Sequence, residues 1–142
     1  MGPRIYTVRE AEALLPVAEK VFTDLDLVRG RIRKLKGKME VLEMLWGDEL
    51  ASPDNPDHAE FGHYASEMER AKGDYDAAVK VLADHEIQLK SLETGLIDFY
   101  GVIDSRLVFL CWKRGETGIG WYHHLEDGFQ GRKELLPAHK TA

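Results

Sequence analysis

Two runs of apolar residues at heptad spacing constrain the fold of this chain more than any other feature. Apolar side chains recur at alternating steps of three and four residues from Ala18 to Trp46, and again from Phe61 to Leu92. This spacing places them on one narrow stripe of a helix, which needs another helix to cover it. The sequence therefore predicts two long helices that bury their stripes against each other.

The segment between the two runs, at about residues 47–58, is rich in residues that interrupt helices, among them Pro53 and Pro56. A break of this length lets the chain reverse its direction. The simplest interpretation is an antiparallel helical hairpin, a two-stranded coiled coil made by a single chain.

Charged residues beside the stripes indicate a register. With the two stripes face to face, Arg31 comes near Asp74 and Lys38 comes near Glu67. Exposed pairs of this kind contribute only ~0.2–1 kcal/mol each, whereas each large apolar side chain that is fully covered contributes roughly 1.5–3 kcal/mol. We therefore expect apolar burial to build the hairpin and charge to select its alignment.

The ends of the helices carry recognisable signals. Thr7, followed three residues later by Glu10, has the form of a capping box and predicts a short helix over 8–15. Pro16 then divides that helix from a long one over 16–46.

The second long helix is expected over 56–92, with Gly95 in the left-handed conformation that ends it. His85 occupies a stripe position of this helix, where a buried and hydrogen-bonded histidine is expected.

After Gly95 the period of the apolar pattern changes from about 3.5 to 2, which is typical of β-strands. Asp104-Ser105 and the segment 114–118 read as the connections of hairpins. The strands are expected at 96–102, 107–113 and 119–125, with a last short strand or ordered loop at 128–132.

The fold class predicted from these patterns is α+β: a long antiparallel helical hairpin packed at its base on a small antiparallel β-sheet. We expect a single domain over residues 1–142. Residues 1–95 form its N-terminal helical hairpin, and residues 96–142 form its C-terminal sheet part.

Composition narrows the classes of function. The formal net charge of −6 disfavours nucleic acid as a direct ligand, and the basic residues at 29–38 are expected to form a solvated helix face. A single cysteine, Cys111, excludes an internal disulfide framework. With no apolar signal peptide and no run of membrane-spanning length, we expect a cytoplasmic protein without a membrane partner.

The side chains with most chemical potential lie in the C-terminal part. Asp98 stands alone in an apolar strand, and a carboxylate there needs a partner, either Arg132 or His123. Asp98, His123 and Arg132 are therefore the candidate catalytic residues, and Asp98, Glu116 and His123 the candidate metal ligands. Because no nucleophile stands next to a base and the ligand spacing is not that of a metal site, the sequence favours a buried ion pair without a cofactor.

The histidine pair His123-His124 does not strengthen the hypothesis of a metal site. Adjacent residues of a strand point to opposite faces, so these two rings cannot chelate one ion together.

Several strings in the chain resemble a known family. They are Tyr6-Thr7-Val8 with Leu14-Leu15-Pro16, Gly95-Leu96-Ile97-Asp98-Phe99, Leu110-Cys111-Trp112-Lys113, Gly120-Trp121-Tyr122-His123 and Gly128-Phe129 with Gly131-Arg132. The chain is similar over nearly its whole length to a prokaryotic family of unknown function, the domain of unknown function numbered 2203. This resemblance implies no activity, substrate or cofactor.

Three functional hypotheses follow. The favoured one is a non-enzymatic protein–protein interaction module. Its protein partner is unidentified and could be a second copy of the chain, which would make a homodimer, and Trp121, Tyr122 and Phe129 are among its expected contact residues. The second is an effector that inserts an acidic-tipped coiled coil, with Asp48 and Glu49 at the tip, into a large machine such as RNA polymerase. The third is a metal-dependent or hydrolytic enzyme that uses Asp98, His123 and Arg132.

Overall fold

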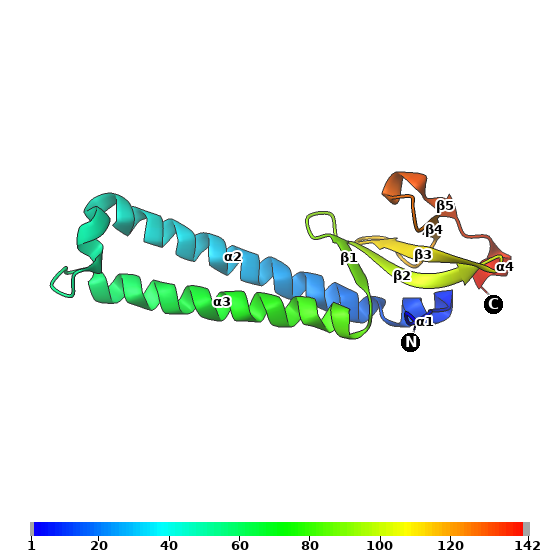
Figure 1. The fold of residues 1–142 in the computed structure, drawn as a ribbon, viewed down its shortest axis with the longest axis horizontal. Helices are drawn as coiled ribbons and strands as arrows, with labels where there is room; N and C mark the ends of the chain where they lie inside the picture. The colour runs from blue at the N-terminus through cyan, green and yellow to red at the C-terminus, as the bar shows by residue number, and fades with distance from the viewer. Residues whose placement is uncertain (1, 141–142) are drawn as a thin grey trace. The chain divides into compact units, whose positions relative to one another are not determined.

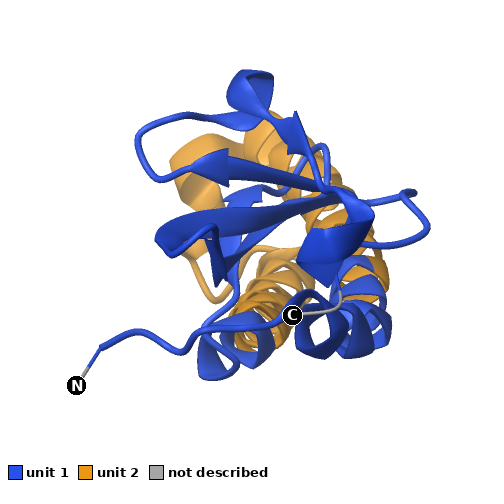
Figure 2. Ribbon diagram, turned by 90° about the vertical axis from the view of Figure 1, so that its right-hand side faces the viewer, with its two compact units in different colours: residues 1–22, 80–142 blue, residues 23–79 orange. Residues whose placement is uncertain are grey.

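The computed structural model describes residues 2–140, and its fold is α+β, as the sequence predicts. Residues 23–79 form one compact unit, the hairpin unit, and the rest of the described chain forms a second, the sheet unit (Figure 2). The elements in chain order are α1 (Val8–Ala13), α2 (Leu15–Trp46), η1 (Gly47–Ala51), α3 (His58–Asp84), β1 (Gln88–Ser91), β2 (Leu96–Ile103), β3 (Arg106–Lys113), β4 (Trp121–His124), η2 (Phe129–Gly131), β5 (Lys133–Glu134) and α4 (Pro137–Lys140).

The first helix begins at the predicted capping box. The backbone N–H of Glu10 donates to Oγ1 of Thr7 at 3.1 Å, and the N–H of Thr7 donates to Oε1 of Glu10 at 2.9 Å. The two residues thus satisfy donors that a helix start leaves free. With α1 ending at Ala13 and α2 beginning at Leu15, the predicted division of the helix near Pro16 is confirmed.

Within the hairpin unit, α2 and α3 lie side by side and run antiparallel (Figure 1). The predicted stripe is the covered side of these helices: Leu25, Val28, Leu42, Ala71 and Ala78 are all buried. Exposing such an apolar stripe to water is unfavourable, so its burial accounts for the pairing of the two helices.

Arg31 and Asp74 confirm the predicted register, because their Nη1 and Oδ2 atoms lie 2.7 Å apart. The second predicted pair is wrong. Lys38 places its Nζ 5.4 Å from the ring centre of Tyr64, and Glu67 forms its ion pair with Arg70 on its own helix. The pair at i and i+3 needs no inter-helix alignment and competes successfully for Glu67.

The end of α3 differs from the prediction, since the helix stops at Asp84 and not at residue 92. Glu86 adopts a left-handed conformation with φ of 57°. The N–H of Ile87 donates to the carbonyl of Leu82, and the N–H of Glu86 to that of Ala83, both at 2.9 Å. This is the pattern of a Schellman cap, with buried Ile87 and Leu82 as its apolar contact.

Residues beyond this cap form a strand where the sequence predicted helix. Gln88–Ser91 is β1, and Gly95 serves the turn that leads into β2 with a φ of 69°. His85 is half-buried beside the cap, where its carbonyl accepts a hydrogen bond from the hydroxyl of Tyr6 at 2.6 Å. It therefore has no place on a helical stripe.

The sheet is antiparallel, with five strands in the order β1-β2-β3-β4-β5. Asp104 and Ser105 both have positive φ, of 53° and 63°, as a two-residue hairpin turn requires. The predicted strands and this predicted connection are confirmed. A last short strand or ordered loop was predicted at 128–132, whereas this segment contains the short helical turn η2 and the strand β5 follows it.

The two faces of the sheet have different cover. On one face Phe99 contacts Tyr6 with ring centres 5.2 Å apart, and Trp112 stacks on Phe22 of α2 at 6.4 Å. The segment before α1 and the start of α2 therefore cover this face, and η2 lies on the opposite side of the sheet from α1 (Figure 1). None of the helices in the described part of the chain is long and apolar enough to cross a membrane.

Candidate functional site

The sheet face opposite α1 carries a buried cluster of Asp98, Cys111 and His123. Asp98 pairs with Cys111 across β2 and β3, and His123 lies on β4 two residues beyond the partner of Cys111. One potential ligand atom from each residue lies within 4.8 Å of those of the other two. Their exposed fractions are 1%, 0% and 4%, so the cluster is closed to bulk water.

Of the two partners that the sequence offered for Asp98, the structure shows His123. Its Nε2 lies 3.0 Å from Oδ2 of Asp98, while its Nδ1 lies 2.9 Å from the backbone carbonyl of His124. A carbonyl oxygen can only accept, so Nδ1 carries a proton and Nε2 turns toward the carboxyl group. Burial raises the pKa of Asp98, and the neighbouring His123 opposes that shift.

Cys111 is not poised to act as a nucleophile. Burial, and then the negative charge of Asp98, raise the pKa of its thiol to about 12. A thiol with such a pKa stays protonated at neutral pH, whereas reactive cysteines are partly exposed thiolates. The cluster lacks the open and activated group that covalent catalysis needs.

Arg132 does not pair with Asp98, and that alternative is wrong. Its Nη2 donates to Oε1 of Glu116 at 2.8 Å, and the same oxygen accepts from the N–H of Lys113 at 2.7 Å. Burial opposes the ionisation of Glu116, but these donors outweigh it and lower the pKa of the carboxyl group. Glu116 is thus engaged with Arg132 and does not join Asp98 and His123 as a metal ligand.

Two of the three predicted contact residues of the sheet unit, Trp121 and Phe129, lie against this ion pair. The guanidinium of Arg132 lies 5.1 Å from the ring centre of Trp121 and 4.6 Å from that of Phe129, whose exposed fractions are 36% and 40%. Tyr122 is half-buried, and its ring contacts His139 at 5.9 Å. Trp121 and Phe129 thus form a partly exposed aromatic border around Arg132, whose charge is already paired with Glu116.

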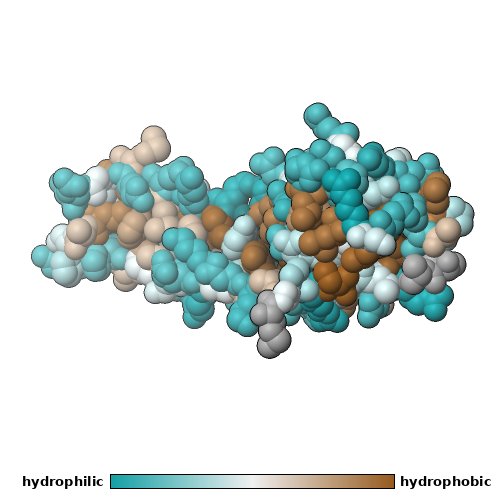
Figure 3. Space-filling model, turned by 45° about the vertical axis from the view of Figure 1, so that its right-hand side comes forward, coloured by the Kyte–Doolittle hydropathy of each residue, from teal (hydrophilic) through white to brown (hydrophobic). Residues whose placement is uncertain are grey.

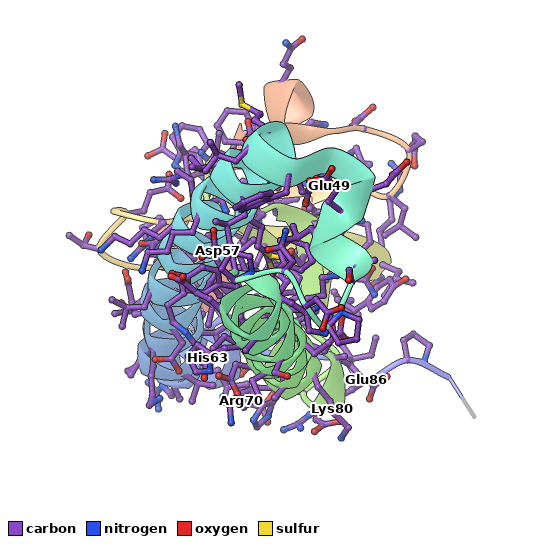
Figure 4. The ribbon with its side chains drawn as sticks, turned by 90° about the vertical axis from the view of Figure 1, so that its left-hand side faces the viewer. Glu49, Asp57, His63, Arg70, Lys80 and Glu86 are labelled. Atoms are coloured by element: carbon purple, nitrogen blue, oxygen red, sulfur yellow. The ribbon has the colours of Figure 1, made fainter. Side chains whose placement is uncertain are left out.

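The acidic tip of the hairpin unit is a folded turn. Nε1 of Trp46 donates to Oδ2 of Asp57 at 2.8 Å, and the N–H of Asp57 donates to Oδ1 of Asn55 at 2.8 Å. Asp48 and Glu49 lie on η1, and Asp48 borders a cavity of about 500 Å³ that Leu50 and other apolar residues also line. Figure 4 looks onto this end, with Glu49 on η1 and Asp57 at the turn before α3.

These tip carboxylates do not form a metal site within residues 2–140. The one group of three or more potential ligands found there is the cluster in the sheet unit. Asp57, one of the acidic residues of the tip, instead has a structural role, because its hydrogen bonds hold the turn together.

The outer face of α2, defined here as Gly37, Val41, Met44 and Leu45, was missed by sequence reasoning. Val41, Met44 and Leu45 are exposed by 57%, 87% and 68%. At 3.6 residues per turn they lie together on the side of the helix away from the buried stripe. Hydrophobic surface is visible on the hairpin unit in Figure 3. A search for apolar residues outside the main heptad positions would have found this second stripe.

Together, the fold and its clusters define an α+β protein with a helical hairpin unit and an antiparallel sheet that buries an aspartate, a cysteine and a histidine. Residues 4–135 match the model of a family described as an uncharacterized conserved protein, DUF2203. The chain belongs to this family, as the resemblance of its motifs predicted. No curated protein and no solved structure matches the chain.

Proposed function

We propose that the protein is a non-enzymatic interaction module that pairs with a second copy of its own chain through the outer face of α2. The observation that carries this proposal is the exposure of Val41, Met44 and Leu45 on one side of a single helix. Contiguous exposed apolar residues with a polar border are typical of protein contact sites. A methionine that is 87% exposed contributes nothing to the packing of its own chain.

Self-complementarity favours a second copy as the occupant. If two α2 helices pack antiparallel about Val41, Leu45 of each copy lies opposite Gly37 of the other. A Cβ built on Gly37 has no atom within 4 Å, so this position offers room for a large side chain from outside. Such a contact uses the same patch on both copies, which is the commonest form of dimer interface.

Charge is consistent with the same alignment. The antiparallel pairing brings Arg33 and Lys34 of one copy toward η1 of the other, which carries Asp48 and Glu49 in its first turn. Opposite charges at the ends of a helix pair mainly select its alignment. The acidic tip and the basic segment of α2 thereby acquire one common role.

Burial weighs against the enzymatic alternative. Asp98 and His123 are almost completely inaccessible, and Arg132 is engaged with Glu116. A catalytic group must reach its substrate, so these residues serve better as the interior of the sheet unit than as a reaction centre.

Sedimentation velocity over a concentration series tests the proposal. The wild-type chain should show a reversible monomer–dimer equilibrium, and Met44→Lys should shift it strongly toward monomer because it places a charge in the contact. Glu43→Gln is the matched control, since it changes the charge by the same unit at an exposed position about 100° around the helix from Met44. It should leave the equilibrium unchanged.

Two outcomes would refute the proposal. One is a wild-type chain that stays monomeric at every concentration. The other is a dimer that survives Met44→Lys but dissociates with Phe129→Ser, because the contact would then lie on the sheet unit.

A further inference from the structure

We infer that Asp98, Cys111 and His123 form a binding site for Zn²⁺ or a closely similar divalent transition-metal ion. The three residues supply one oxygen, one sulfur and one nitrogen donor, the ligand types that Zn²⁺ takes in proteins. This site lies in the sheet unit and is separate from the proposed contact surface on α2. The sequence offered Glu116 as the third ligand, whereas the geometry offers Cys111.

The spacing of the donors suits one small ion. Metal–ligand distances of about 2.0–2.3 Å place neighbouring donors of a tetrahedron roughly 3.3–3.7 Å apart. The three donor atoms lie within 4.8 Å of one another, and Nε2 of His123 and Oδ2 of Asp98 are 3.0 Å apart. Small rotations of the side chains therefore bring all three to a common ion.

His123 is already oriented as a ligand. Its Nδ1–H donates to the carbonyl of His124, which fixes the ring and leaves Nε2 facing the other two donors. Metal-binding histidines commonly donate their second ring N–H to a carbonyl or carboxylate in this way. The backbone thus supplies the support that a ligating histidine needs.

Asp98 has an oxygen that the protein leaves without a strong partner. Its Oδ1 is buried and meets no strong donor, because the hydrogen bond that the Asp98 side chain has with Cys111 comes from a thiol, which is a weak donor. A proton shared between Asp98 and His123 would satisfy Oδ2 and Nε2 alone. A cation in contact with the carboxylate would also compensate the second oxygen, whose desolvation is otherwise costly.

Charge balance also favours a dication. When Zn²⁺ binds, the S–H bond of Cys111 breaks and an S–Zn bond forms. The proton shared by Asp98 and His123 is also displaced, so two protons leave to solvent for each ion bound. The thiolate and the carboxylate together carry two negative charges, which neutralise the ion, while the imidazole stays neutral. A buried site with no net charge avoids the penalty of an isolated charge in a medium of low dielectric. The three donors leave a fourth tetrahedral position for a water molecule.

Cobalt substitution of the reduced, untagged full chain tests this inference, because Co²⁺ takes the same ligands and is coloured. The wild type should bind one Co²⁺ per chain, with a thiolate-to-cobalt charge-transfer band and the strong visible bands of a tetrahedral ion. Zn²⁺ should displace the cobalt, erase the bands and raise the melting temperature.

Variants locate the site. Cys111→Ser preserves size and should abolish the charge-transfer band and weaken binding by ~100-fold or more, since even supporting residues of metal sites are worth 10–100-fold. His63→Gln removes an exposed histidine of the hairpin unit and is the matched control, with bands equal to those of the wild type.

The inference is overturned if the folded wild type retains no metal. Asp98 and His123 would then be a buried pair that shares a proton. It is equally overturned if Cys111→Ser binds Co²⁺ with unchanged affinity and spectrum. Because the wild-type spectrum alone can contradict it, the test does not depend on whether a variant folds.

Discussion

Neutralising Glu116 should destabilise the sheet unit by a predictable amount. Glu116→Gln keeps the shape of the side chain but removes the charge that faces Arg132, whose side chain is only 11% exposed. Hydrogen bonds to charged groups contribute about 1.5–3 kcal/mol, roughly twice the value for neutral pairs, so replacing the charged acceptor of both bonds with a neutral amide oxygen costs on the order of 2 kcal/mol. For a domain of this size, that corresponds to a melting temperature lower by about 6 °C.

The loss should depend on pH in a defined direction. The pKa of Glu116 in the folded chain lies below the ordinary value of 4.5, so its contribution to stability is fully present above pH 4.5. It is lost as the pH falls through the folded-state pKa, because the wild-type side chain then also becomes neutral. The difference in melting temperature between wild type and Glu116→Gln should therefore be largest near pH 7 and should shrink at acidic pH.

Thermal unfolding followed by circular dichroism from pH 7 to pH 3 measures this difference. Glu126→Gln is the matched control, since Glu126 pairs with Arg106 at 3.2 Å with both side chains more than half exposed. Exposed pairs contribute ~0.2–1 kcal/mol, so this variant should melt close to the wild type. Equal losses for both variants, or a Glu116→Gln difference that does not shrink as the pH falls below 4.5, would refute the reasoning.

Four further substitutions test the packing and the helix ends, each by chemical denaturation. Gly101→Ala should cost about 1–3 kcal/mol, because its Cβ would lie 2.7 Å from Cγ of buried Leu110, whereas Gly73→Ala, in open space on α3, should stabilise by up to about 1 kcal/mol. Leu25→Ala, at a position with no exposed surface, should cost about 2–5 kcal/mol, and a loss below 1 kcal/mol would contradict its place in the buried stripe between α2 and α3. Glu86→Gly should stabilise by up to about 1 kcal/mol because φ is 57° there, and a loss of stability would show that the side chain of Glu86 matters more than this strain.

The sequence predicted helix ends and turns well where a few neighbouring residues determine them. The capping box at Thr7, the end of α2 at Trp46 and the turn at Asp104-Ser105 each depend on a few neighbouring residues. The end of α3 was missed because Glu86, and not a glycine, adopts the left-handed conformation. The cap is closed by the hydrogen bond from the N–H of Ile87 to the carbonyl of Leu82. The heptad pattern of apolar residues runs through this point without a break, so it gave no sign that the helix ends there.

The candidate site was predicted only in part. Alternation along the strand could place Cys111 on one face, and a two-residue turn at 104–105 pairs it with Asp98, so the sequence contained the signal for this neighbour. Arg132 was assigned to the wrong alternative because its partner Glu116 is sixteen residues away across a loop. Long-range pairing of this kind follows from how the loop folds, which periodicity does not encode.

Cysteine cross-linking tests the central claim, the antiparallel pairing of two chains through the outer face of α2, most directly. Val41 lies on the proposed two-fold axis, whereas Leu27 is exposed on the same helix fourteen residues away. In the paired state the two copies of residue 27 are separated by about 42 Å along the helices. The native Cys111 is buried and contributes little background.

The Val41→Cys variant should be captured as a covalent dimer by a short thiol-specific cross-linker, and the Leu27→Cys variant should not be cross-linked. Equal cross-linking at both positions, or capture at Leu27→Cys alone, would contradict the proposed pairing.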